Sequence, residues 1–500
     1  MIYTPKKQSI FHLTSLSPSP STPSDSERAR SLTRRSSLTP VTSPTRAPLI
    51  QDGSYLEALG LRLNEAVAKA LAHPSGPSRT SELVRGRCPI PAGRGRVMGK
   101  LVASELQAAR DDKHLYRAVL RAVQKPLSVL LSNLSALLLP LLSSPAFLQP
   151  PVPTVQMPNP NATQLHALGI ADFAGELLST FDDTALGIET DSRGDGLQPI
   201  RAGLVSLIGR VVTPLITGIK EALIPLLDAL EIPDNTTPHK AKGSVHPSIT
   251  ALQSSVPVYG RALARYATTY HSDTLLASFL ISIVWRALVA LSHRPMMTQS
   301  ATSVILSEKC QYPSSPRDLS PTGLFNLKRG SSRSASLVTP STAVADAKAL
   351  YEIFSQFPRP THTQVAREAV EEAFAHLETL MSLLAIAGDP FFVVNRTAEE
   401  IADEIHGLTD DLPTLIALPV LLRVQYFGGV LEPQVNTVAA FLNIPEDIYR
   451  KDCLAGFGRA EQWGPVLAHR ALDEIYAGPV VDSPTCFVDW LEDRLGQNDH

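Results

Sequence analysis

The stretch Asp273–Arg294, DTLLASFLISIVWRALVALSHR, decides the fold class of this chain. Its apolar residues recur at the spacing of one helix face, and the opposite side is hardly polar either. A helix that is apolar nearly all round must be covered by neighbours on several sides. Ser272 or Asp273 can cap its start, and Pro295 follows its end. The sequence therefore predicts a buried helix at the centre of a helical domain.

The composition of the whole chain also favours helix. The 500 residues are 44% hydrophobic and only 6% aromatic, and Leu and Ala supply much of the apolar content. The formal net charge of −3 gives no bias toward nucleic acid. The four cysteines form no CxxC pair, which argues against a disulfide framework or a zinc module and fits a reducing compartment. We therefore expect no metal and no cofactor.

The first residues, MIYTPKKQSIFHLTSL, lack the long apolar core of a secretory signal peptide. The expectation is an intracellular protein, cytoplasmic or nuclear. Residues 1–48 and 296–343 are rich in Ser, Thr, Pro and Arg and show no sustained period. Such segments cannot bury enough apolar surface to fold, so the sequence predicts a disordered tail and a disordered insert. An N-terminal helical region, 49–295, and a C-terminal one, 344–500, are expected to pack on each other.

In the N-terminal region, helical spacing predicts helices over 50–72, 101–125, 127–148, 164–181, 200–231 and 249–265. Pro126 is expected to kink or restart the chain, and Pro214 and Pro225 to divide 200–231 into short pieces. Pro-Leu-Leu recurs late in two of these apolar segments, which hints at a solenoid of helix pairs. The fold class is therefore all-α, an irregular helical array or bundle with a solenoid as the regular alternative.

In the C-terminal region, two helix starts carry the pattern of a capping box, Thr361 to Gln364 and Thr397 to Glu400. The first opens a helix that runs to about 387, and the second a helix through Ile401 and Ile405. The remaining pattern predicts helices over 344–357, 412–424, 433–442, 445–455, 461–476 and 484–495.

Residues 85–100, RGRCPIPAGRGRVMGK, form a basic stretch that contains several glycines. It matches neither a Walker A loop nor a dinucleotide loop, because the glycine spacing is off by one in each case and no strand precedes it. Two interpretations are left, a solvated hinge or a connector that contacts an acidic partner or a phosphorylated tail. The candidate anion contacts are Arg85, Arg87, Arg94, Arg96 and Lys100.

The two Ser/Pro-rich segments carry patterns typical of kinase substrates. Arg-x-x-Ser-Leu occurs in both, at Ser37 and at Ser336, and suits basophilic kinases. Ser-Pro and Thr-Pro steps beside them suit proline-directed kinases. The candidate phosphorylation sites are Ser37, Thr39, Ser43, Ser332, Ser336 and Thr339.

Residues 127–148, LSVLLSNLSALLLPLLSSPAFL, contain no charged side chain and are long enough to cross a bilayer. Five serines, an asparagine and two prolines interrupt the run, which a core helix of a soluble bundle explains more simply. Membrane association through this stretch is the alternative.

No catalytic motif with specific spacing is present, so no catalytic residue is assigned. Cys453, His469 and Asp473 can in principle supply a nucleophile, a base and an orienting acid. The expected function is an intracellular, non-catalytic scaffold or adaptor with protein partners, regulated by kinases that act on its disordered segments. A membrane-associated protein is the second hypothesis, and an enzyme of unidentified class is the third.

Overall fold

The computed structural model confirms the all-α fold class. The parts of the chain that it describes contain helices α1 to α15 and no β-strand, apart from one isolated bridge between Val84 and Arg87. The described residues are 53–72, 83–84, 86–151, 160–186, 196–232, 246–294, 342–388, 397–426, 437–477 and 485–496.

The chain divides into two compact units. The first contains the described residues of 1–219, 261–279 and 358–369, and the second those of 220–260, 280–357 and 370–500. Each unit therefore takes segments from both sides of residues 296–343, whereas the sequence predicts two contiguous regions, 49–295 and 344–500. The division falls within four helices: α5 (Gln198–Asp228), α6 (Pro247–Tyr266), α7 (Tyr270–Ser292) and α9 (Gln364–Ala387).

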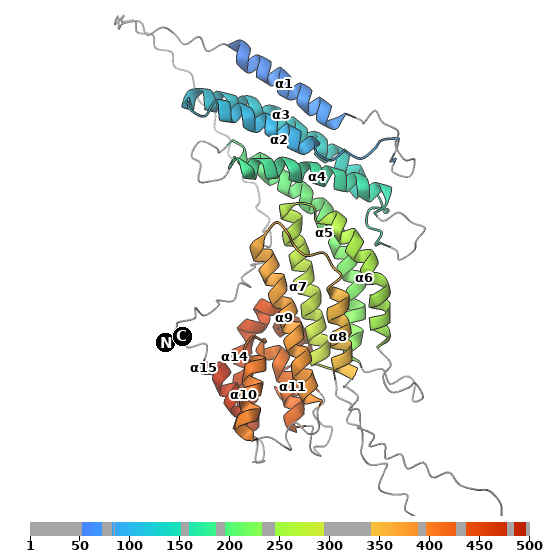
Figure 1. The fold of residues 1–500 in the computed structure, drawn as a ribbon, viewed down its shortest axis with the longest axis vertical. Coiled ribbons are helices and arrows are strands. Elements are labelled where there is room, and N and C mark those ends of the chain that lie inside the picture. Colours follow the sequence, from blue (N-terminus) through green and yellow to red (C-terminus); the bar gives the residue numbers. More distant parts are fainter. Residues whose placement is uncertain are drawn as a thin grey trace, which may run out of the picture. The chain divides into compact units, whose positions relative to one another are not determined.

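The first unit is built on four helices that lie alongside one another (Figure 1). Helix α2 packs along α4, α1 packs along α3, and α3 also contacts α4. Their buried faces are rich in leucine, as the apolar spacing predicts. The four are α1 (Gly53–Leu71), α2 (Arg94–Ala108), α3 (Lys113–Leu142) and α4 (Ala162–Asp183).

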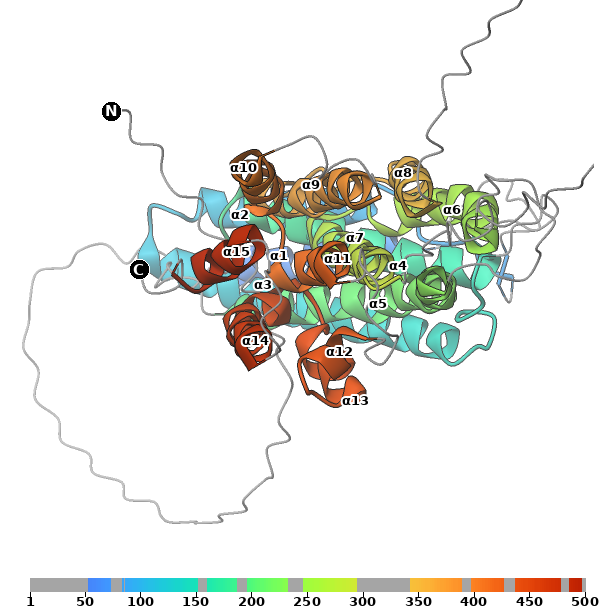
Figure 2. The ribbon, with the colours of Figure 1, turned by 90° about the horizontal axis from the view of Figure 1, so that it is seen from below.

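The second unit holds the C-terminal helices, several of which Figure 2 shows nearly end-on. Helix α14 contacts both α11 and α15, and α15 contacts α10. The elements are η2 (Ala229–Glu231), α8 (Thr342–Phe354), α10 (Ala398–Thr409), α11 (Thr414–Tyr426), α12 (Val438–Phe441), α13 (Glu446–Ile448), the π-helical turn η4 (Tyr449–Cys453), α14 (Phe457–Ala477) and α15 (Thr485–Gly496).

Helix α7 is buried as predicted, but its start is different. Leu280, Ile283 and Leu291 are completely buried. The helix begins at Tyr270, because Thr269 and Ser272 exchange hydrogen bonds as a capping box. The prediction that Ser272 or Asp273 caps the helix is therefore wrong, and the carboxylate of Asp273 has another role.

Asp273 accepts hydrogen bonds from the backbone N–H groups of Thr361 and His362, at 2.7 and 2.6 Å. The Thr361–Gln364 capping box predicted for α9 is absent, because Asp273 takes the Thr361 N–H and the Gln364 side chain donates to Glu368. The second capping box is confirmed: Thr397 and Glu400 bond reciprocally at the start of α10.

The prolines do not break the helices where the sequence predicts. Helix α3 continues through Pro126 and Pro140, and α5 continues through Pro214 and Pro225. An interior proline costs about 3 kcal/mol in an isolated helix, but packing offsets this cost where the flanking residues are buried. Pro126 is itself buried, as are Leu127 and Leu130. The chain leaves the helical conformation earlier, between α2 and α3, where Asp112 caps the start of α3. The prediction of a single helix over 101–125 is therefore also wrong.

The glycines of the basic stretch allow α2 to approach α4 closely. Gly93 has φ of 89°, a left-handed conformation that glycine adopts without strain. A Cβ placed on Gly95 would lie 2.2 Å from the carbonyl oxygen of Phe173, and one on Gly99 would lie 2.6 Å from Thr180. Helix packing therefore explains the glycine pattern that resembles a phosphate loop.

Gly95→Ala is expected to destabilise the protein by about 1–3 kcal/mol, because backbone of α4 would have to move. Gly60→Ala is the matched control, since a Cβ at that helical position meets nothing within 4 Å among the described residues. The control should be neutral or stabilising, by about 0.5–1 kcal/mol, through higher helix propensity. Chemical unfolding of both variants measures the difference, and equal stability would contradict the close packing of α2 on α4.

Candidate functional site, a charged cleft beside the π-helical turn

A cleft of about 410 Å³ lies in the second unit, between α7 and the turn η4. Its apolar residues come from α7 and from the end of η4, and its charged residues from η2, α5, α7, α13 and η4. The lining residues are Asp228, Glu231, Arg286, Val289, Ala290, Asp447, Arg450, Lys451 and Leu454. We call this the charged cleft.

The π-helical turn is fixed by hydrogen bonds from α7. The indole Nε1 of Trp285 donates to the carbonyl oxygen of Leu454 at 2.9 Å, in a buried position. The Nε2 of His293 lies 3.0 Å from the hydroxyl of Tyr449. π-Helical turns of this kind occur frequently at functional sites. Because both ends of the turn are held, Arg450 and Lys451 face the charged cleft from a rigid support.

The two arginines of the charged cleft already have partners within the chain. Arg286 pairs with Asp228, with Nε to Oδ1 at 2.7 Å and Nη2 to Oδ2 at 3.0 Å. Arg450 binds both carboxylate oxygens of Glu231 and also reaches Glu446, at 2.5 Å. Acidic and basic side chains therefore alternate around an apolar floor, and the cleft has no single dominant sign of charge.

The basic groups near the charged cleft are affected by burial. Burial, and then the charge of Arg286, lowers the pKa of Lys220. Burial lowers the pKa of Arg423 to about 10, while its guanidinium donates to the carbonyl oxygen of Ser292 at the end of α7. Burial likewise lowers the pKa of His293 to about 3, with smaller effects from Arg423 and Arg450 in the same direction. His293 is therefore neutral at physiological pH.

A second polar cluster holds the end of α7 to α8. Arg294 and Asp346 form an ion pair at 2.5 Å, and their side chains are only 6% and 2% exposed. Asp346 also accepts a hydrogen bond from the backbone N–H of His246, just before α6. The cluster joins three helix ends and lies away from solvent, so its role is structural.

The basic stretch in the first unit binds a carboxylate of the chain itself. Glu176 of α4 accepts hydrogen bonds from the N–H groups of Gly93, Gly95 and Arg96, at 2.6, 3.0 and 3.3 Å. A carboxylate at a helix start complements the exposed N–H groups and the helix dipole. The start of α2 is thus an anion site that Glu176 occupies.

The predicted anion contacts have different surroundings. Arg94 donates to the carbonyl oxygens of Ala70 and Ala72, at the end of α1. Arg87, Arg96 and Lys100 are exposed, and Arg85 lies outside the described residues. Arg94, Arg96 and Lys100 belong to α2, so the expected loop over 85–100 ends at Gly93. Whether the exposed cations contact a phosphorylated segment stays a prediction.

The six candidate phosphorylation sites, Ser37, Thr39, Ser43, Ser332, Ser336 and Thr339, all lie outside the described residues. The same holds for the segments 1–48 and 296–341, on which the predicted tail and insert depend.

The three residues considered as a nucleophile system have very different exposures. His469 and Asp473 do lie one helical turn apart in contact, at 3.1 Å, with side chains 69% and 67% exposed. Cys453 is completely buried, and burial raises the pKa of its thiol, which disfavours the reactive thiolate. Among the described residues, no group of three or more His, Cys, Asp or Glu side chains is placed to hold a metal ion.

Three described helices are long and apolar enough to cross a membrane, judged by length and composition alone: α3, α5 with η2, and α7. The uncharged stretch 127–148 forms the second half of α3 and the turn after it. Membrane association through this stretch stays a prediction.

Sequence reasoning missed the residues that bind the helix starts, Glu176, Asp273 and Asp346. Each lies on an apolar helix face, at a position where a solvated carboxylate would not be expected. A carboxylate inside an apolar pattern was the available signal, but the helix start that it binds lies 80 or more residues away in all three cases. Such pairs cannot be read from local spacing.

Comparisons with known proteins add little. No protein-family model and no curated protein sequence matches this chain. Among solved structures, a crystal structure of the C-terminal domain of the exocyst subunit Sec6p is similar over 87% of this chain and 92% of that one, at 10% sequence identity and a TM-score of 0.36. A TM-score of this size does not establish a common fold.

Replacing one partner of the Arg294–Asp346 pair should cost about 3–5 kcal/mol in unfolding free energy, because the other charge stays buried. Arg294→Met and Asp346→Leu combined should recover most of this loss, since neither charge is then left alone. Asp473→Ala, in the exposed pair with His469, is the control and should leave stability unchanged. Urea unfolding measures all four variants; single variants as stable as the control would contradict the assignment.

His293 should make stability depend on pH. Its folded pKa of about 3 lies below the ordinary value of 6.5, so between these values only the unfolded chain binds the proton. Stability is therefore lost as pH falls from 6.5 toward 3, at up to about 1.4 kcal/mol per pH unit. His293→Gln should flatten the pH dependence of the melting temperature in this window.

Trp285→Phe is the matched control for His293→Gln. It removes the other hydrogen bond from α7 to the turn η4 but changes no titratable group. It should lower the melting temperature by a similar amount at every pH. Identical pH profiles for the two variants would show that His293 does not titrate as described.

Proposed function

We propose that the protein is a non-catalytic scaffold that holds protein partners on a fixed array of helices. The observation that carries this proposal is the use of carboxylates in joints between helices. Glu176, Asp273 and Asp346 each bind backbone N–H groups at or just before the start of another helix. These groups are engaged in holding the array together, and the faces between the joints are available to partners.

The charged cleft supports the proposal as a docking position for a protein partner. Its two ion pairs are only partly buried, with Asp228 and Arg286 44% and 42% exposed. Half-exposed pairs can exchange partners with charged side chains of a bound protein, and the apolar floor of Val289, Ala290 and Leu454 offers area to bury. Alternating charge favours specificity of orientation over strength of binding.

The test is reconstitution of a three-component complex. Partners identified by cross-linking of the tagged full-length chain are purified, and each pair is tested with and without the chain. A scaffold should bring together two partners that do not bind each other alone. The proposal fails if every partner found associates to the same extent in the absence of the chain.

A charge-swap variant tests the charged cleft itself. Asp228→Arg with Arg286→Asp keeps an ion pair but reverses its direction, and should lose at least one partner by about tenfold or more in Kd. Asp182→Arg with Arg201→Asp is the matched control, a swap at an ion pair in the first unit. Equal effects of the two swaps would count against the cleft.

We also propose regulation of this assembly by phosphorylation at the six candidate sites. Each phosphate adds nearly two negative charges and can pair with exposed cations such as Arg87, Arg96 and Lys100. Replacing all six sites by Ala should change complex formation in the reconstitution above. Mass spectrometry of the protein from cells that finds both segments unmodified would contradict this part alone.

A further inference from the structure

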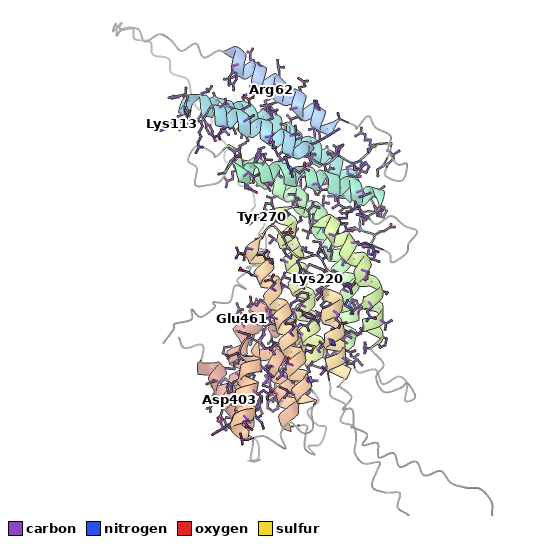
Figure 3. The ribbon with its side chains drawn as sticks, in the orientation of Figure 1. Arg62, Lys113, Lys220, Tyr270, Asp403 and Glu461 are labelled. Atoms are coloured by element: carbon purple, nitrogen blue, oxygen red, sulfur yellow. The ribbon has the colours of Figure 1, made fainter. Side chains whose placement is uncertain are left out.

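The solvent-facing side of α3 carries a row of cations followed by exposed apolar residues. Lys113, Arg117, Arg121 and Lys125 follow one another at a spacing of four and are all exposed. This spacing places their side chains on one side of a helix. Figure 3 labels Lys113 at the start of the row. We call this row, with its continuation along the same side of the helix, the α3 ridge.

The four cations of the α3 ridge have no ion-pair partner in the part of the chain that the structure describes. Helix α3 contains no Asp or Glu, and no ion pair to these four residues occurs among the described residues. Asp112, directly before the helix, accepts hydrogen bonds from the N–H groups of His114 and Leu115 as its N-cap. The first half of the α3 ridge therefore carries a net positive charge toward solvent.

The second half of the α3 ridge is uncharged and partly apolar. Val129 and Leu139 are 45% and 65% exposed, and Ala136 between them is exposed as well. The hydroxyls of Ser128, Ser132 and Ser143 donate to carbonyl oxygens four residues earlier, at 2.9, 3.0 and 3.0 Å. These serines can lie against an apolar layer without an unsatisfied donor.

Going beyond the scaffold function, we propose that the α3 ridge docks on a membrane surface rich in acidic lipids. The cations would bind the headgroups, and Val129, Ala136 and Leu139 would lie at the boundary between headgroups and acyl chains. A cluster of Lys and Arg on a helix favours acidic lipids, and exposed apolar residues on the same side add area that the boundary between headgroups and acyl chains can bury. From Lys113 to Leu139 the ridge is about 40 Å long, which allows the four cations and the apolar residues to engage together.

The uncharged half distinguishes a lipid surface from other polyanions. A nucleic acid or an acidic protein would bind the cations alone. Neither partner would explain why Val129 and Leu139 are exposed beside serines whose hydroxyls donate within the helix. The apolar part of α3 is also the least covered of the three long apolar helices, with 28% of it buried against 67% for α7. The opposite side of α3 is committed to the protein core, since Leu130, Leu134 and Leu138 are at most 1% exposed. The helix therefore lies on the membrane and does not cross it.

The experiment is flotation of the full-length protein with vesicles of phosphatidylcholine alone or with 30% phosphatidylserine (roughly the charge of a cytoplasmic leaflet). We expect binding only to the acidic vesicles, and release when NaCl is raised from about 0.05 to about 0.5 M. Each Lys or Arg near an acidic surface contributes roughly fivefold in affinity. Changing all four ridge cations to Gln should thus weaken binding by on the order of a hundredfold or more.

Two further variants make the result specific. Arg261, Arg265, Lys348 and Arg470, all exposed, changed to Gln remove the same charge elsewhere and should leave binding within about twofold of wild type. Val129→Ser with Leu139→Ser keeps all charge and should weaken vesicle binding severalfold, while binding to heparin stays unchanged.

Each other result overturns the proposal. If the protein does not float with acidic vesicles at low salt, the α3 ridge is not a membrane-docking surface. If the control variant loses as much vesicle binding as the ridge variant, binding depends on total charge and not on the ridge. Heparin binding as tight as vesicle binding, with no effect of the Val129 and Leu139 changes, would assign the ridge to a soluble polyanion. Resistance to carbonate extraction would show a spanning helix. None of these outcomes depends on the three-component complex, so failure here leaves the scaffold proposal standing.

Discussion

Carboxylates that bind the starts of distant helices are the interaction on which this structure depends. The first N–H groups of a helix have no partner inside it, and a buried helix start must find one elsewhere. At α2 the partner is Glu176 of α4, before α9 it is Asp273 of α7, and before α6 it is Asp346 of α8. Each contact satisfies donors at or just before a helix start and fixes one helix end against another, and at α2 it also complements the helix dipole. Apolar packing alone allows helices to slide, whereas these contacts define their register.

The sequence predicts the apolar part of this arrangement well and the polar part poorly. The helical spacing of Asp273–Arg294 identifies α7, and the residues on its apolar faces are the ones found buried. A local capping box, Thr397 to Glu400, is equally readable because both partners lie within one turn. The Asp273 contact is not readable, because Thr361 is 88 residues away and the sequence around it favours a local cap. A long-range hydrogen bond replaces the local cap at such a position because one buried carboxylate can satisfy two N–H groups at once.

The prolines were misjudged, and the glycines were not explained, because both depend on packing between helices that local spacing does not show. A proline inside α3 or α5 is unfavourable in an isolated helix, but the helix is not isolated, and burial around Pro126 outweighs the lost hydrogen bond. Gly95 and Gly99 allow a close approach of the backbone to another group, as glycines of a phosphate-binding loop do, whereas Gly93 supplies a left-handed conformation. In this chain the approaching group is helix α4, and its Glu176 accepts hydrogen bonds from the backbone N–H groups at the start of α2.

The distribution of charge separates the structural from the available groups. Arginines at 94, 294 and 423 donate to carbonyl or carboxylate oxygens of the chain, and each holds the end of a helix. Arg286 and Arg450 are paired but partly exposed, so a partner's side chain can compete for them at modest cost. The cations of α3 stand at the other extreme, exposed and without an ion-pair partner on the described surface. The desolvation cost of an exposed cation is small, so an external anion can bind it with a net gain in free energy. A buried ion pair offers no such gain, because its two charges already bind each other. External contacts should therefore be sought first at α3, next at the charged cleft, and not at the buried joints that hold helix ends together within each unit.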